Sequence, residues 1–172
     1  EVLPTIVSRC QKIELNPVSS EQIVNTLIDK YNVEVRKAEF LAKISHGCPG
    51  KALSMVEDDK FLLERSRILD ALRELTDADR EKRLIYASYL THEFSKNRRT
   101  LNIMFSLWTD WWRDIFLVKE NHRELITNID REGELVEQAV HYTTGQIDKF
   151  IRELQTIQIS LKQNANPRLA LE

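Results

Sequence analysis

Turn-forming residues are scarce in this chain of 172 residues, which contains only four Gly and four Pro. A β-sandwich needs many tight turns built from such residues, so the composition excludes that class of fold. Long apolar runs are also missing, because the longest extend over only a few residues, against the ~20 that a membrane-spanning helix needs. Hydrophobic residues still make up 42% of the chain, which is enough for a buried core. Leu, Ile, Glu, Lys and Arg dominate, and this composition predicts an all-α fold.

Cysteine is rare as well, and the two that occur, Cys10 and Cys48, favour a reducing compartment without disulfides. No segment has the basic, apolar and small-residue regions of a secretory signal, so we expect a cytoplasmic protein with no membrane partner. The chain begins with Glu1 rather than Met, and we interpret it as a fragment of a longer protein.

Sequence signals for a metal or phosphate site within the chain are lacking. The four His residues form no i, i+4 pair and the two Cys form no CxxC motif, so we expect no metal site. Neither GxGxxG nor GxxxxGK[ST] occurs, so the chain by itself has no recognisable phosphate-binding loop. The net charge of −2 gives no general argument for binding nucleic acid.

Hydrophobic spacing divides the chain at about residues 57/58. Residues 2–7 and 13–15 resemble short strands, although Pro4 would interrupt the first. Three short helices are predicted next, starting at Ser19 or Ser20, at about Val35 and at about Pro49. Ser19 and Gln22 fit a capping box for the first of them. We therefore expect a small three-helix bundle over residues 12–57.

Longer helices are predicted over residues 58–172. Two begin near residue 58 and near Asp77–Asp79, and a third carries apolar residues at three- and four-residue steps from Leu101 to Phe116. Residues 119–132 are polar and irregular. A short pattern over 135–140 and a clean apolar stripe over 147–161 predict two more helices, with a break near Gly145. Pro167 suits the first turn of a last helix.

The most conspicuous side chains of the third long helix are Trp108, Trp111 and Trp112. Their regular spacing on one apolar stripe favours a core or helix-interface role over stacking with nucleic acid.

Two short segments attract attention beyond the helical pattern. Ser8-Arg9-Cys10 places an arginine after an extended segment, where its planar fork could hold phosphate oxygens, or where it is simply exposed. The segment from Gly47 to Leu53 contains Gly50 and Lys51 in a turn that opens a helix, which suits an anion or is simply a turn between helices.

In this order, the two segments resemble the C-terminal half of an AAA+ clamp-loader subunit. The stretch Leu3-Pro4-Thr5-Ile6 and Ser8-Arg9-Cys10 is similar to that family's Ser-Arg-Cys motif, and residues 47–53 are similar to its sensor 2 region, here including Gly47, Gly50 and Lys51. Trp111-Trp112-Arg113-Asp114 and residues 164–172 resemble the collar domain of bacterial members.

The resemblance implies residues 1–11 as the end of an AAA+ core, 12–57 as a lid and 58–172 as a collar that joins a ring of subunits. It implies that Arg9 is an arginine finger toward ATP and Mg bound by a neighbouring subunit, with no cofactor held by this chain itself. It implies as interface candidates Trp108, Trp111, Trp112 and Arg113. Its implied partners are the gamma/tau and delta subunits and, indirectly, the sliding clamp and primed DNA.

One position departs from the family pattern. ATP-hydrolysing members carry an arginine at the fourth position of the sensor 2 stretch, where this chain has Gly50 followed by Lys51. The Lys51 side chain leaves the helix ~100° further round, so it is a poor substitute. This departure favours an accessory subunit that is not itself an enzyme. The alternative is an ATP-hydrolysing gamma/tau motor subunit of the same complex.

Overall fold

The computed structural model describes residues 4–11, 13–163 and 165–171, and within these ranges the chain is helical or irregular, with no strand. The all-α prediction is confirmed. The chain forms two compact units, Glu1–Leu53 and Ser54–Glu172. The division falls inside helix α4 (Pro49–Glu57), slightly before the predicted position at 57/58.

The first fifteen residues differ from the sequence prediction. Residues Pro4–Val7 form a single helical turn, α1, instead of a strand, and residues 13–15 are irregular. Ile13 and Leu15 are 78% and 92% exposed. A strand needs a neighbour to accept its backbone hydrogen bonds, and no described segment supplies one, whereas Pro is well suited to the first turn of a helix. Val2 and Leu3 lie outside the described residues.

The first unit contains the predicted short helices, α2 (Ser20–Tyr31), α3 (Val35–Ile44) and the start of α4. Ser19 is the N-cap of α2, and its hydroxyl accepts the Gln22 N–H at 3.3 Å, which is one half of the predicted capping box. Asn32 ends α2 in a left-handed conformation with φ 53°. Helices α2 and α3 pack together, with Leu27 and Leu41 in the core.

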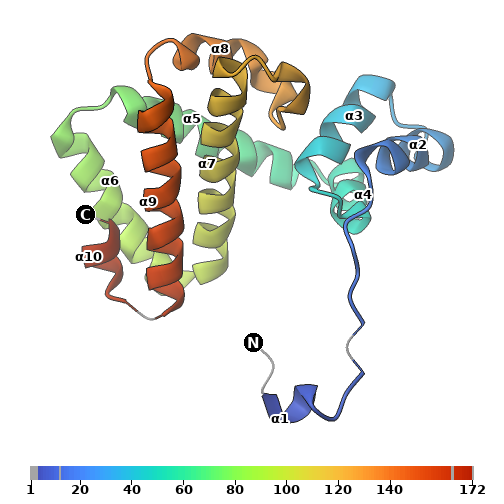
Figure 1. The fold of residues 1–172 in the computed structure, drawn as a ribbon, viewed down its shortest axis with the longest axis horizontal. Helices are drawn as coiled ribbons and strands as arrows, with labels where there is room; N and C mark the ends of the chain where they lie inside the picture. The colour runs from blue at the N-terminus through green and yellow to red at the C-terminus, as the bar shows by residue number, and fades with distance from the viewer. Residues whose placement is uncertain (1–3, 12, 164, 172) are drawn as a thin grey trace. The chain divides into compact units, whose positions relative to one another are not determined.

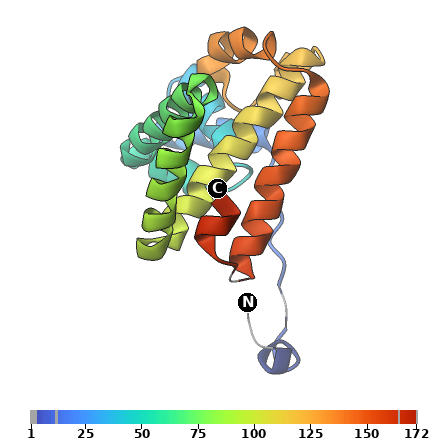
Figure 2. The same cartoon turned by 90° about the vertical axis from the view of Figure 1, so that its left-hand side faces the viewer.

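The second unit is built around the long helix α7 (Arg98–Lys119). This helix contacts α5 (Lys60–Asp77), α6 (Arg80–Lys96), α8 (Glu132–Ala139) and α9 (Thr144–Lys162). Figures 1 and 2 show α6 and α9 each running antiparallel to α7, with α10 (Pro167–Leu171) between their ends. The link from α7 to α8 contains two 3₁₀ turns, Arg123–Leu125 and Ile129–Arg131. No helix in the described ranges is long and apolar enough to cross a membrane.

Local side-chain caps determine where these helices begin. Asp79 accepts the Lys82 N–H at 2.9 Å and starts α6, as its acidic residue type predicts. The N–H of Asn97 donates to Glu93 at the end of α6, while the Asn97 side chain caps the start of α7. Thr143 and Gln146 form a full capping box at the start of α9, so the predicted break precedes Gly145 and leaves it in the first turn.

The core of the second unit follows the α7 pattern closely, but the α6 pattern only in part. Among the apolar residues of α6, Leu90 is buried, whereas Ile85 and Tyr89 are 63% and 54% exposed. Helix α6 lies at the edge of the unit, in contact with α7 and α10, so one side of its apolar surface has no cover in the described chain.

Candidate functional site

Arg9 follows α1 in a turn that presents its side chain to solvent. The Ser8 hydroxyl donates to the Thr5 carbonyl at 3.1 Å, and the Arg9 N–H donates to the Ile6 carbonyl at 3.0 Å. The side chains of Ser8, Arg9 and Cys10 are all exposed, and none of the described residues pairs with the Arg9 guanidinium group. Arg9 is therefore accessible to an anionic group from outside the chain.

The turn from Ser45 to Pro49 has a structural reason for its glycine. Gly47 has φ 76°, and a Cβ atom there would lie 2.5 Å from the Pro17 Cβ. The Gly47 carbonyl accepts the Val18 N–H at 2.9 Å, which attaches the segment before α2 to this turn. A glycine is therefore required at position 47, because Pro17 approaches its backbone closely and because its φ angle is positive.

Lys51 and Gly50 lie at the start of α4, and the Lys51 ammonium group is directed toward the end of α3. The Lys51 Nζ donates to the Ile44 carbonyl at 2.8 Å, so its charge is at the C-terminal end of α3. Gly50 is exposed, and a Cβ there would have open space around it. It borders a hollow of about 160 Å³ within the first unit.

The three tryptophans belong to the core of the second unit. Trp108, Trp111 and Trp112 are 7%, 1% and 3% exposed. The Trp111 indole N–H donates to the Gln138 side chain at 2.8 Å. A partner would reach only the more exposed side chains nearby, among them Arg113, whose side chain is 48% exposed and whose Nη1 donates to the Thr127 hydroxyl at 3.2 Å.

A buried cluster of polar side chains, the Arg65 cluster, connects α5 to the segment between α7 and α8. Arg65 is 3% exposed and holds both carboxylate oxygens of Asp130, at 2.7 and 2.8 Å. Its Nη2 also donates to the Asn128 side chain at 2.6 Å. This bidentate arrangement is the strongest geometry available to an arginine, and it gives the irregular link between the helices a defined position.

Asp114 extends the Arg65 cluster into α7. One oxygen, Oδ2, accepts the backbone N–H groups of Thr127 and Asn128 at 2.9 and 2.7 Å and the Asn128 side-chain amide at 2.7 Å. Oδ1 is buried without a hydrogen bond within the described chain, 3.6 Å from the Arg113 Nη1. Burial raises the pKa of the Asp114 carboxyl, against the lowering effect of these donors and of Arg113.

Sequence analysis missed the Arg65 cluster, although a signal was present. Arg65 stands in the stripe formed by Leu62, Leu69 and Leu72, and Asp114 lies beside the buried Trp111. A charged residue inside an apolar stripe indicates a buried partner elsewhere in the chain. The hydrogen bonds of the cluster attach the link between α7 and α8 to helix α5, which is a structural role.

Metal-binding groups are lacking in the described ranges, where no three His, Cys, Asp or Glu side chains are placed to hold an ion. The two cysteines are exposed and unbonded. Comparisons with protein-family models, with curated proteins and with solved structures found no match.

Proposed function

We propose that this chain is the C-terminal part of a delta prime subunit of the bacterial DNA polymerase III clamp loader. In that role it forms a ring with the gamma/tau and delta subunits, which opens the sliding clamp and loads it onto primed DNA in the cytoplasm. The observation that carries the proposal is the exposed Arg9 within Ser8-Arg9-Cys10, whose guanidinium group pairs with none of the described residues, because an arginine finger has to reach a neighbouring subunit.

Arg9 would act in trans, on ATP and Mg held by the adjoining subunit. Its guanidinium group stays charged and can donate two parallel hydrogen bonds to phosphate oxygens, where negative charge develops during hydrolysis. No described carboxylate competes for it. The chain thus supplies one catalytic group to a site whose nucleotide belongs to a neighbour.

The start of α4 supports an accessory role rather than that of an ATP-hydrolysing motor. Gly50 has no side chain to contact a γ-phosphate, and the Lys51 Nζ is engaged by the Ile44 carbonyl. An enzyme of the motor type needs a cation at this point of its own site, so these contacts favour delta prime over gamma/tau.

The exposed apolar surface of α6 supports assembly into a ring. Leu84, Ile85 and Tyr89 are 44%, 63% and 54% exposed on this edge helix. Contiguous exposed apolar side chains are typical of protein interaction surfaces.

The decisive experiment reconstitutes the clamp loader from full-length subunits and measures its ATP hydrolysis with Arg9→Ala. Arginine fingers contribute about 10³–10⁵ in rate in other phosphoryl-transfer proteins, so we expect hydrolysis at the adjoining site to fall by at least about tenfold. Arg36→Ala, an exposed arginine on α3, is the matched control and should leave the rate unchanged.

Two outcomes would contradict the proposal. Unchanged hydrolysis with Arg9→Ala, in a complex that light scattering shows to be fully assembled, would remove the finger assignment. Hydrolysis of ATP by the full-length protein alone would favour the gamma/tau alternative instead.

A further inference from the structure

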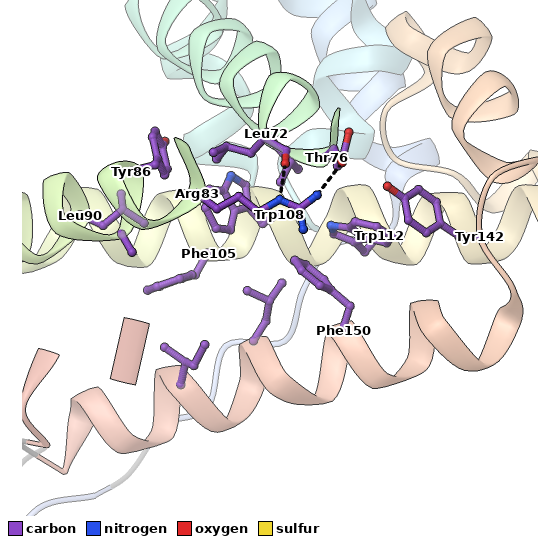
Figure 3. A pocket seen from close by; sticks show the side chains of 14 residues that line it. Leu72, Thr76, Arg83, Tyr86, Leu90, Phe105, Trp108, Trp112, Tyr142 and Phe150 are labelled. Atoms are coloured by element: carbon purple, nitrogen blue, oxygen red, sulfur yellow. Dashed lines mark hydrogen bonds between the residues drawn. The ribbon is translucent and has the colours of Figure 1, made fainter. Parts of the chain in front are cut away.

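A cavity of about 340 Å³ lies within the second unit, between the end of α5 and helices α6, α7 and α9. Figure 3 shows Arg83, Trp108, Trp112, Tyr142 and Phe150 around it. Its volume is at the lower end of the range for small-molecule sites, about 300–1,000 Å³. None of the residues that line the cavity belongs to the Ser8-Arg9-Cys10 segment or to the Arg65 cluster.

Trp108 and Trp112, which line the cavity, have indole N–H groups without an acceptor in the described part of the chain. Trp108 and Trp112 are 7% and 3% exposed, and the Nε1 of each has no hydrogen-bond partner among the described residues. Trp111, on the same helix, shows the ordinary arrangement, because its N–H is bonded to Gln138. A buried donor left unpaired costs about 1–3 kcal/mol, so an acceptor that reached either N–H group would be stabilised there.

Arg83 adds a positive charge to the same wall. Its Nε and Nη2 donate to the carbonyls of Leu75 and Thr76 at 3.1 and 2.9 Å, and these bonds hold the side chain along the cavity, as Figure 3 shows. None of the described carboxylates forms an ion pair with Arg83. The Thr76 hydroxyl is already bonded to Arg73 and Gln138. Arg83 and the two indoles therefore offer donors, which select an anionic group.

The rest of the wall is aromatic. The Trp112 ring lies 4.4 Å from the Phe150 ring and 4.9 Å from the Tyr142 ring, centroid to centroid, and Trp108 lies 6.2 Å from Tyr86. Ring faces and edges of this kind contact a flat aromatic body favourably. We propose that the cavity binds a small aromatic carboxylate, with its rings among these side chains and its carboxylate toward Arg83 and the indole N–H groups.

The test titrates naphthalene-2-carboxylate into the ¹⁵N-labelled chain and follows the three indole N–H signals by NMR. We expect saturable shifts of the Trp108 and Trp112 signals, whereas the Trp111 signal, bonded to Gln138, serves as an internal control. The neutral naphthalene-2-carboxamide should bind at least about fivefold more weakly, because it lacks the charge that Arg83 faces.

Two variants separate specific binding from a general affinity for aromatic molecules. Arg83→Gln should weaken naphthalene-2-carboxylate binding about tenfold and leave the carboxamide almost unaffected, whereas Arg80→Gln, an exposed residue outside the cavity wall, should change neither. Trp112→Phe keeps an aromatic ring, although a smaller one, and removes one donor, and we expect about fivefold weaker binding.

Several results would overturn the proposal: no saturable shift at millimolar ligand, equal shifts of all three indole signals, or equal affinity of the carboxylate for the parent chain and Arg83→Gln. Arg83→Gln removes a charge and two hydrogen bonds to carbonyls from an exposed side chain, and it leaves the buried aromatic core unchanged, so it keeps the test valid even where Trp112→Phe fails to fold.

Discussion

Replacing Arg65 with alanine should destabilise the second unit strongly. The change removes three hydrogen bonds, two to Asp130 at 2.7 and 2.8 Å and one to Asn128 at 2.6 Å. Removing one member of a buried ion pair costs about 3–5 kcal/mol, because the other is left without a partner. Asp130 is 32% exposed, so water compensates part of its loss, whereas Asn128 is 1% exposed. We expect the free energy of unfolding to fall by about 3 kcal/mol.

Urea unfolding followed by tryptophan fluorescence measures this effect, since all three tryptophans lie in the second unit. Arg67→Ala is the matched control on the same helix. The Arg67 side chain is 80% exposed and its ion pair with Glu64 is long, at 3.9 Å, so we expect the free energy of unfolding to change by no more than about 0.5 kcal/mol. A double-mutant cycle with Asp130→Ala should give a coupling energy of about 1–3 kcal/mol. A loss below about 1 kcal/mol for Arg65→Ala, or one equal to the control, would refute the reasoning.

Two further predictions concern single residues. Gly47→Ala should destabilise the first unit by about 2 kcal/mol, because Gly47 has a positive φ and a Cβ there would meet Pro17. Faster amide hydrogen exchange in α2 would show this loss. Gly133→Ala is the control, because a Cβ at Gly133 would meet no other atom within 4 Å, and equal exchange rates in the two variants would contradict the prediction. Burial raises the pKa of the Asp114 carboxyl in the folded state above 3.8, so the folded state binds this proton more tightly than the unfolded state does. The free energy of unfolding that Asp114 contributes therefore declines as the pH rises from the unfolded pKa through the higher folded pKa. The stability of Asp114→Asn relative to the parent chain should therefore increase from pH 4 to pH 7 in urea titrations, and a constant or decreasing difference would count against it.

The local pattern determined much of the helical framework. The caps at Ser19 and Asp79 and the apolar stripe of α7 were readable because each depends on residues three or four positions apart. The prediction of strands near the N-terminus was wrong, because strand formation does not depend on local residues alone. A strand is completed only by a second segment, and alternation within a few residues carries no information about whether that segment exists.

The candidate sites show the same difference between local signals and contacts that join remote segments. The Ser8-Arg9-Cys10 and Gly47–Lys51 segments could be found from the sequence, because each is continuous along the chain. The sequence could not show that the Lys51 ammonium group points to the Ile44 carbonyl. That contact depends on how α3 and α4 fold back on each other.

By itself, the sequence determined that this chain is helical, where most of its helices begin and end, and that Trp108, Trp111 and Trp112 share an apolar stripe. Only the tertiary structure decided which indole N–H is satisfied and which has no acceptor among the described residues. It likewise decided that Arg65 meets Asp130, a residue sixty-five positions away. The physical reason is that helix formation depends on neighbours within one turn, whereas pairing of buried polar groups depends on packing between segments that are remote in sequence.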